Sequence, residues 1–462
     1  MALDKYCESL CEPDRPKREQ KPIQNTIKPH QASEDLIMSD LSALQNLNII
    51  NFNHNLTCQS DLSMTSLKNV GFRKMYQIRC SNCNFIQTWN ASMNMPDGKD
   101  FVTAKLLHGF FTSGMQKVHF ERLAASTGIK HICSNLFIKY VEEYSQQVEA
   151  EKQSSCLLAL SEELDNAEKA NHVDIATDAR HSTRKNSQFT DVVCVGYKTK
   201  KVIDNKVVSR GDDPCAQRHE LIGTKTVYNS LQDKGVNVRR HVHDRNASIN
   251  KYVREQQSST TNQNDTWHVS VSVGKQLKAI SAGAKCREGK TWSVQLADKV
   301  GPVKTHVQYA MRNCSGDKQK LVSMLENVVA HYENKHDNCL SSSRCKQDTN
   351  YIPSRQIITN SAAKQLLLSA IHSFDVYKHP ENYIHAMGTF LVESFNNTLN
   401  VFHDKRIGTL GKKHYVMKTN LAVCHWNENV CAKKKNNSYS YRNNIWARWM
   451  SKVFTSELWR PF

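Results

Sequence analysis

The sequence predicts an α/β protein in which a helical region precedes a mixed β-sheet. Three observations support this fold class: apolar residues recur at helical spacing across 101–150, strand-like alternation begins near residue 172, and helical spacing returns around Leu321–Val329. The chain has 462 residues, long enough for two to four domains at roughly 100–200 residues each. We therefore expect one large α/β core with smaller units before it.

The composition indicates a partner of opposite charge. Lys and Arg total 62 against 44 Asp and Glu, which gives a net charge of +18 and a pI near 9.2. Such a field attracts nucleic acid, although a basic protein can also simply be soluble. No apolar run reaches the roughly 18 residues of a membrane span, and the first residues lack a signal-peptide pattern. We expect an intracellular protein with no membrane partner.

The 15 cysteines are odd in number and thinly spread, which favours reduced thiols, some of them binding metal. Cys80 and Cys83, with two residues between them, form half of a zinc knuckle in the segment 51–100. Cys58 and His54 are the nearest source of the other two ligands. The alternative is a reduced cysteine pair without metal.

Residues 1–50 are expected to form a flexible basic arm. The stretch is polar, with four prolines set among charges and no periodic apolar stripe before Leu36. The basic cluster at 15–21 could serve as a nuclear import signal, or it belongs to a solvated tail. Localisation in the nucleus is the prediction that follows from the first interpretation.

Residues 101–170 are predicted to be helical. Two apolar stripes, around 120–129 and 136–144, flank the turn at Ser126–Gly128, which fits a helix-turn-helix. Lys130 and Lys139, on or near the second helix, would then contact phosphates. A helical hairpin that binds nothing is the alternative. A charged connecting helix is expected from Glu149 to Ala170.

A different pattern begins at residue 171 and continues to about residue 430. Alternating segments predict strands, with helical spacing between and after them. The expected order is strand 172–178, strand 189–197, strand 201–209, helix 220–234, strand 236–242 and helix 248–255. Three antiparallel strands, a helix and a further strand form a mixed sheet of the ribonuclease H type, in which the first and fourth strands are neighbours.

Acidic residues close those two neighbouring strands. Asp178 ends the first, Asp244 follows the fourth, and Glu393 lies on a later amphipathic helix whose Phe390 and Phe395 are expected to pack inward with Leu399 and Phe402. Three such carboxylates can hold two divalent cations, which suits phosphodiester chemistry on nucleic acid. Asp174 competes with Asp178 for the first ligand position. Strand caps and a helix-boundary glutamate are the ordinary alternatives.

Four segments together resemble one family, the Mutator-like DDE transposases and especially their animal relatives. The resemblance covers roughly residues 75–430 and rests on Thr177-Asp178-Ala179-Arg180, His243-Asp244-Arg245-Asn246-Ala247-Ser248-Ile249, Asp265-Thr266-Trp267-His268 and Val392-Glu393-Ser394-Phe395-Asn396. It implies an acidic triad of Asp178, Asp244 and Glu393 that binds two Mg²⁺ or Mn²⁺ ions. It also implies that Asp265 and His268 form an accessory Asp-x-x-His motif. Thr177 and Ala179 stand where relatives often have glycines, which leaves a decayed or domesticated copy open.

The long gap before Glu393 resembles the helical insertion of these transposases, expected here at about 270–375. The stripe at Leu321, Leu325, Val328 and Val329 is consistent with it. Near its middle, His331, His336, Cys339 and Cys345 could bind zinc. The alternative is a helix end with incidental thiols.

A tail rich in basic and aromatic residues, 431–462, either contacts nucleic acid or forms an amphipathic helix with a solvated basic face. Candidate DNA-binding residues are Lys130, Lys139, Arg245, Lys412 and Lys413.

These features predict a nuclear DNA transposase. The resemblance implies hydrolysis at transposon ends and strand transfer into target DNA, both double-stranded, with at least a dimer needed to hold two ends. The alternative is a domesticated DNA-binding protein that has lost catalysis. A general ribonuclease H-type nuclease is the third option, and it leaves the insertion and the N-terminal helices unexplained.

Overall fold

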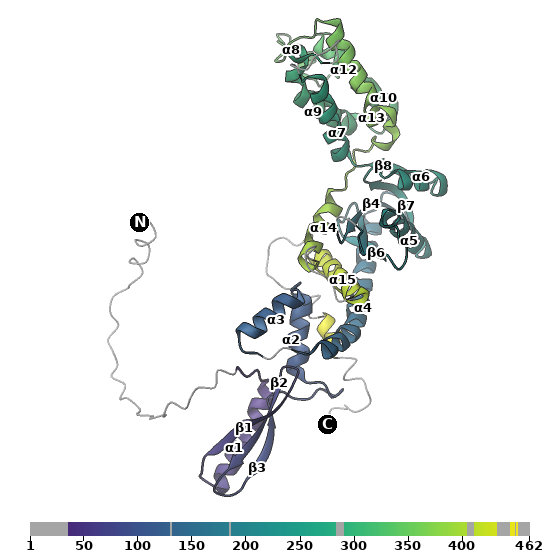
Figure 1. Ribbon diagram of the computed structural model, residues 1–462. Coiled ribbons are helices and arrows are strands. Elements are labelled where there is room, and N and C mark those ends of the chain that lie inside the picture. The colour runs from purple at the N-terminus through teal and green to yellow at the C-terminus, as the bar shows by residue number, and fades with distance from the viewer. Residues whose placement is uncertain are drawn as a thin grey trace, which may run out of the picture.

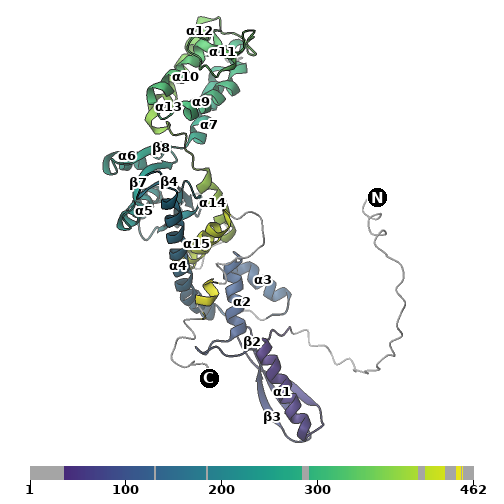
Figure 2. The same ribbon diagram turned by 180° about the vertical axis from the view of Figure 1, so that it is seen from behind.

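The computed structural model describes residues 36–129, 132–183, 186–282, 291–403, 411–431, 444–448 and 450. The molecule is elongated, with a small sheet at one end, a mixed sheet in the middle and a helical region at the other end (Figures 1 and 2). The predicted import signal at 15–21 and most of the predicted tail lie outside the described residues. No helix among the described residues is long and apolar enough to cross a membrane.

The N-terminal unit is one helix packed on an antiparallel sheet. Its elements are α1 (Leu41–Thr57), β1 (Leu62–Val70), β2 (Arg73–Cys80) and β3 (Ile86–Asn90), with strand order β1-β2-β3. Asp40 caps α1 by accepting from the Ala43 N–H, so this helix begins inside the stretch that we expected to be an arm. Trp89 packs under the helix and donates from Nε1 to the Ala43 carbonyl at 2.8 Å.

The region that follows is helical, with α2 (Phe101–Thr112), α3 (Lys117–Ser126) and α4 (Ser134–Asp165). We predicted a recognition helix followed by a separate connecting helix, but α4 is one continuous helix of 32 residues. Its buried side chains, among them Tyr140, Tyr144 and Val148, pack in the same core as Leu107 and Phe111 of α2. The second half of α4 is charged and shows little apolar periodicity, so tertiary packing, and not local pattern, keeps it helical.

The central sheet has five strands in the order β6-β5-β4-β7-β8. The strands are β4 (His172–His181), β5 (Phe189–Gly196), β6 (Val202–Ser209), β7 (Asn237–His243) and β8 (Thr261–Asn264). β4, β5 and β6 pair antiparallel, whereas β4–β7 and β7–β8 are parallel. The predicted adjacency of the first and fourth strands is confirmed. β8 was not predicted, because Thr-Asn-Gln-Asn carries no apolar alternation.

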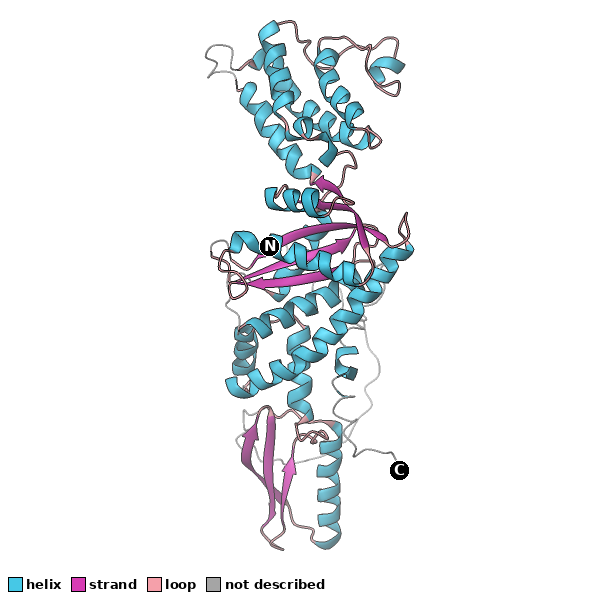
Figure 3. Cartoon of the chain, turned by 90° about the vertical axis from the view of Figure 1, so that its right-hand side faces the viewer, coloured by secondary structure: helices cyan, strands magenta, loops and turns pink. Residues whose placement is uncertain are grey.

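Helices cover both faces of this sheet (Figure 3). The helices α5 (His219–Asp233) and α6 (Ala247–Gln256) pack on one face, where Val173, Ile175 and Cys194 point. The helices α14 (Phe390–Phe402) and α15 (Lys412–Asn429) pack on the other face, against Ala176 and Val193. Neighbouring strand residues thus enter opposite layers, as the two-residue period requires.

The helical region between β8 and α14 has a core of its own. Its helices are α7 (Thr266–Ile280), α8 (Ser293–Leu296), α9 (Val300–Asn313), α10 (Lys318–Tyr332), α11 (Arg344–Gln347), α12 (Ser361–Ser373) and α13 (Asp375–Lys378). The stripe Leu321, Leu325, Val328 and Val329 is buried in this core, together with residues of α7, α9 and α12. The chain then returns to the central sheet through α14, as the figures show (Figure 1).

Candidate active site

Three aspartates lie close to one edge of three adjacent parallel strands. Asp244 and Asp265 directly follow β7 and β8, whereas Asp178, which we predicted to end its strand, lies within β4 because pairing with β5 continues to His181. In the β4–β7 register Ala176 is paired with Val242, so Asp178 and Asp244 each lie two residues further along. In the β7–β8 register His243 is paired with Asn264, and Asp244 and Asp265 come next. The strand order therefore brings residues that are far apart in sequence to one edge of the sheet.

The helix α14 adds Glu393 to this edge from its first turn. His268, in the first turn of α7, lies among three carboxylates. Its Nε2 is 3.3 Å from Asp244 Oδ1, 3.6 Å from Glu393 Oε1 and 3.7 Å from Asp265 Oδ2. Asn396, one turn after Glu393, donates from Nδ2 to Asp178 Oδ2 at 2.8 Å. His268 therefore lies between Asp244 and Glu393 with Asp265 beside it, and Asn396 links Asp178 to the helix that carries Glu393.

The carboxylates crowd one another. Burial raises the pKa of Asp178 to about 7, and the charges of Asp244, Glu220 and Glu393 contribute, although the Ala179 N–H opposes the shift. The pKa of Glu220 is also raised, first by burial and then by Asp244. So many negative groups at close range favour a site that binds a cation.

The donor atoms fit a hard divalent cation. Asp178, Asp244 and Glu393 offer oxygens, the ligands that Mg²⁺ and Mn²⁺ prefer. Asp178, Glu393 and Asn396 line one cavity of about 490 Å³. Among the described residues, Asn396 Oδ1 and Glu220 Oε1 are buried without a hydrogen-bond partner. Unpaired buried oxygens are costly, and a bound cation or its water would satisfy them.

Asp265 is engaged by protein groups on both of its oxygens. Its Oδ1 accepts from the Trp267 N–H at 2.8 Å and so caps α7, while Oδ2 lies 2.9 Å from the Thr389 hydroxyl. That hydroxyl is also 3.3 Å from Asp244 Oδ1, but its single proton serves one acceptor at a time. These contacts make Asp265 a residue that positions His268 and the start of α14.

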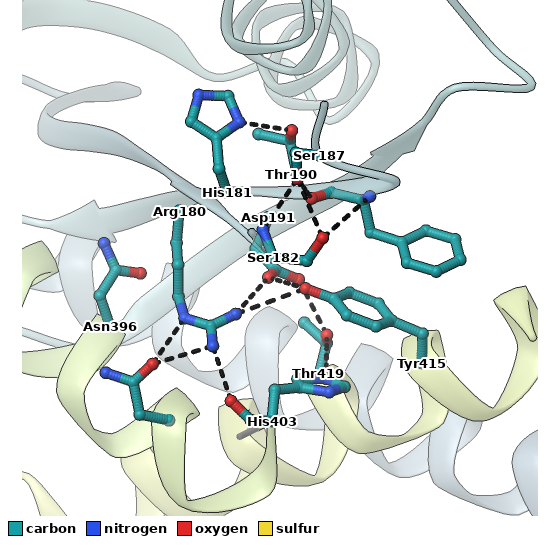
Figure 4. Close-up of polar contacts among 12 residues, drawn as sticks. Arg180, His181, Ser182, Ser187, Thr190, Asp191, Asn396, His403, Tyr415 and Thr419 are labelled. Atoms are coloured by element: carbon teal, nitrogen blue, oxygen red, sulfur yellow. Dashed lines mark hydrogen bonds and ion pairs between the residues drawn. The ribbon is translucent and has the colours of Figure 1, made fainter. Parts of the chain in front are cut away.

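A buried polar network fixes α14 and α15 on the sheet (Figure 4). Arg180 lies 3.2 Å from Asp191 Oδ2 and donates to the side chain of Asn400 and the carbonyl of His403. Tyr415 on α15 donates to Asp191 as well. Arg180 lies two residues after Asp178 on β4. Its guanidinium thereby ties β4 and β5 to α14, the helix that carries Glu393.

Other predicted residues lie elsewhere. Asp174 is held by Arg239 at 2.9 Å and is also bridged by Arg240, so it is an ion-pair partner and not part of the carboxylate cluster. Phe390, which we expected to pack inward, is 60% exposed because it precedes the buried face that starts at Leu391.

The predicted DNA contacts are on the surface. Arg245 is paired with Asp375 at 3.5 Å, Lys412 with Asp212 at 2.9 Å and Lys413 with Glu142 at 3.3 Å. Lys139 is exposed on α4. Lys130 lies outside the described residues.

Three residues of the site were missed from the sequence. Asn396 lies one turn after Glu393 on the same helix, so helical spacing could have found it. Thr389 precedes α14, where its hydroxyl contacts Asp265 and Asp244. Glu220 enters from α5 and accepts from Asn246 at 2.7 Å, a contact that no sequence pattern announces.

A second candidate metal site lies in the N-terminal unit, formed by His54, Cys58, Cys80 and Cys83, whose ligand atoms lie within 4.8 Å of one another. His54 Nε2 is 3.3 Å from Cys83 Sγ, and the sulfurs of Cys58 and Cys80 are 3.9 Å apart. Hydrogen bonds from the Ser60 backbone and Asn82 lower the pKa of Cys58 to about 6, which favours the thiolate. The predicted ligand set is brought together.

A comparison with protein-family models agrees with the family resemblance of the site residues. The family model of Mutator-like transposases matches residues 35–226 and 212–345. This span covers most of the chain, so the protein belongs to the Mutator-like transposase family. The family gives it a transposase-derived function, with DNA as the expected partner and divalent metal as the expected cofactor. The matched span holds Asp178, Asp244, Asp265 and His268 and ends before Glu393. No curated protein sequence matches the chain significantly.

Proposed function

We propose that this protein is a DNA transposase whose ribonuclease H-like core cleaves phosphodiesters at transposon ends and joins them to target DNA. The observation that carries the proposal is the convergence of Asp178, Asp244 and Glu393 on one edge of a mixed sheet, with His268 between two of them. The strand order and the two antiparallel pairs before the first parallel one are those expected of a ribonuclease H-like sheet.

The three carboxylates would hold two Mg²⁺ or Mn²⁺ ions. Such ions activate a water or a 3′ hydroxyl and stabilise the leaving oxygen of an in-line displacement. The protein itself orients the ligands. Asn396 and the Ala179 N–H each donate to one oxygen of Asp178, and His268 approaches Asp244 and Glu393 from the α7 side. Arg180 on β4 ties α14 to the sheet through the side chain of Asn400 and the carbonyl of His403.

Exposed aromatic groups next to the site would contact the DNA. Trp267, 57% exposed, is next to His268, and Phe390, 60% exposed, lies three residues before Glu393. Exposed aromatic rings beside a phosphodiester site can stack on unpaired bases. The charge of +18 supplies attraction to the backbone. A protein that acts on chromosomal DNA would work in the nucleus, and synapsis of two ends would require at least a dimer.

The experiment is a strand-transfer assay with purified protein, element-end DNA and Mg²⁺ or Mn²⁺. Asp178→Asn, Asp244→Asn and Glu393→Gln should each abolish nicking and transfer, because each removes a charged ligand. Binding to end DNA should remain within a few-fold of wild type. Nicking at the wild-type rate by any one of these variants would remove that residue from the triad.

A domesticated, catalytically silent DNA-binding protein is the second candidate. Thr177 and Ala179, where the resemblance to these transposases leads us to expect glycines, favour it. Thr177 is buried and its hydroxyl lies 2.7 Å from His241 Nε2, so the side chain is built into the fold next to Asp178. Specific DNA binding by the wild type without nicking in either Mg²⁺ or Mn²⁺ would favour this candidate. Inverted repeats flanking multiple genomic copies would favour the active enzyme.

A further inference from the structure

We propose that His331, His336, Cys339 and Cys345 form a structural Zn²⁺ site that fastens the connection between α10 and α12 to the end of α10. The four residues come from the last turn of α10, the chain that follows it and the short helix α11. Their ligand atoms all lie within 4.8 Å of one another. This site is separate from the carboxylates of the central sheet and from the Cys/His cluster of the N-terminal unit.

The distances between ligand atoms are those of a tetrahedral centre. With Zn–S bonds of about 2.3 Å and Zn–N bonds of about 2.0–2.1 Å, a sulfur and a nitrogen on one ion lie about 3.6 Å apart. Cys339 Sγ is 3.5 Å from His331 Nδ1 and 3.8 Å from His336 Nδ1, and Cys345 Sγ is 3.8 Å from His331 Nδ1. The three distances, which together involve all four ligands, therefore agree with one ion placed between them.

Neighbouring groups orient two of the ligands. His336 Nε2 lies 2.9 Å from the amide oxygen of Asn334, and an N–H there leaves the Nδ1 lone pair directed at the cluster. Asn327 on α10 donates from Nδ2 to Cys339 Sγ at 3.4 Å, which favours a thiolate. Metal-bound histidines and thiolates characteristically have such outer contacts, whereas incidental thiols at a helix end do not require them.

The ligand set selects the ion and the role. Two thiolates and two imidazoles suit Zn²⁺ and exclude Mg²⁺, which prefers oxygen. Four protein ligands close a tetrahedral site and leave no position for substrate, so the site is structural. Cys339 and Cys345 are both free thiols in the described structure.

The local fold explains what the ion would stabilise. Between α10 and α12 the described chain runs from 333 to 360 with one four-residue helix, a length at which connections are uncommon in compact domains. Its far end is held by Ile358 N–H donating to the Tyr332 carbonyl at 2.8 Å. Cys339 and Arg355 of this segment also line a cavity of about 760 Å³ together with His306 and Lys320. An ion bound by His331 and Cys339 would fix the part of the cavity lining that lies close to the end of α10.

Zinc content measured on the full-length protein tests the proposal. The Cys339→Ser/Cys345→Ser variant should hold one zinc fewer per chain than wild type, by mass spectrometry of the metal after extensive dialysis. Cys133→Ser, which changes an exposed cysteine that belongs to neither Cys/His cluster of the described residues, is the matched control and should lose none. The Cys80→Ser/Cys83→Ser variant reports the N-terminal site separately. An unchanged zinc content in Cys339→Ser/Cys345→Ser would overturn the proposal.

A measurement on wild-type protein needs no variant to fold. Alkylation of Cys339 and Cys345, read by peptide mass spectrometry, should be at least tenfold slower with zinc bound than after chelation, whereas exposed Cys133 and Cys431 should be unaffected. Chelation should also expose Arg344 and Lys346 to tryptic cleavage, and adding zinc back should restore their protection. Alkylation of Cys339 and Cys345 at the same rate with and without chelator would refute the site.

Discussion

Replacing Asp178 by Asn should stabilise the metal-free protein while it abolishes catalysis. Asp178 lies among Asp244, Glu220 and Glu393, and burial with these charges raises its pKa to about 7 from an ordinary value of 3.8. The folded state therefore holds the ionised carboxylate at a cost. The amide of the variant is uncharged, keeps the contact with the Ala179 N–H, and can accept or donate to Asn396 after that side chain turns over.

The size of the effect follows from the two pKa values. Their difference corresponds to about 4 kcal/mol, because one unit is about 1.4 kcal/mol. Water in the open cavity screens part of this, so we expect about 2–3 kcal/mol at pH 8. Below pH 3.8 the folded and unfolded carboxylates are both protonated and the cost vanishes. Between pH 3.8 and 7 the unfolded state loses its proton first, so wild type loses stability as the pH rises.

Thermal unfolding of wild type and Asp178→Asn in chelator from pH 4 to pH 8 is the assay. The variant should melt roughly 4–10 °C higher at pH 8, with the gap closing toward pH 4. Mg²⁺ should raise the melting temperature of wild type more than that of the variant. Asp244→Asn, whose side chain is 42% exposed, should show a smaller gain. If the variant were less stable than wild type at pH 8 in chelator, the ionised Asp178 carboxylate would not destabilise the folded protein as described.

Three further predictions concern the buried Arg180 network, the cap that Glu163 forms on the turn after β5, and the N-terminal Cys/His cluster. Arg180→Ala should cost about 3–5 kcal/mol in urea unfolding, because it leaves the buried carboxyl of Asp191 without its cation. The exposed Arg254→Ala should change the stability little, and equal effects of the two variants would refute the role of the network. Glu163→Ala should cost about 2–3 kcal/mol by the same measurement, because Glu163 accepts from the backbone N–H groups of Lys198 and Thr199; a loss under about 0.5 kcal/mol would contradict this. Cys58→Ser should release one metal ion and shift the fluorescence of buried Trp89 as α1 detaches, and unchanged metal content would exclude Cys58 as a ligand.

Much of the central sheet could be predicted from the sequence. Alternation of residue types along the sequence predicted β4 to β7, and the helices between them showed ordinary apolar spacing. The structure buries every residue of β5, because helices cover both faces of the sheet. β8 was not predicted because its four residues are polar, and its position in the sheet depends on parallel pairing with β7. The sequence did not predict that α4 is one continuous helix, because packing on α2 and α15 extends the helix into a charged segment without apolar periodicity.

The candidate site also combines features that the sequence determined with features that only the tertiary structure decided. The order of residues by itself determined the candidate ligands, because Asp178 and Asp244 follow apolar strands, and the Cys and His spacings of both clusters can be read directly. Only the tertiary structure decided which of them meet. The strand register places Asp178 beside Asp244, the Arg239 guanidinium removes Asp174, and the seating of α14 on β4 brings Glu393 and Asn396 to the same edge. Contacts between elements remote in sequence depend on packing and pairing in three dimensions, which local pattern does not encode.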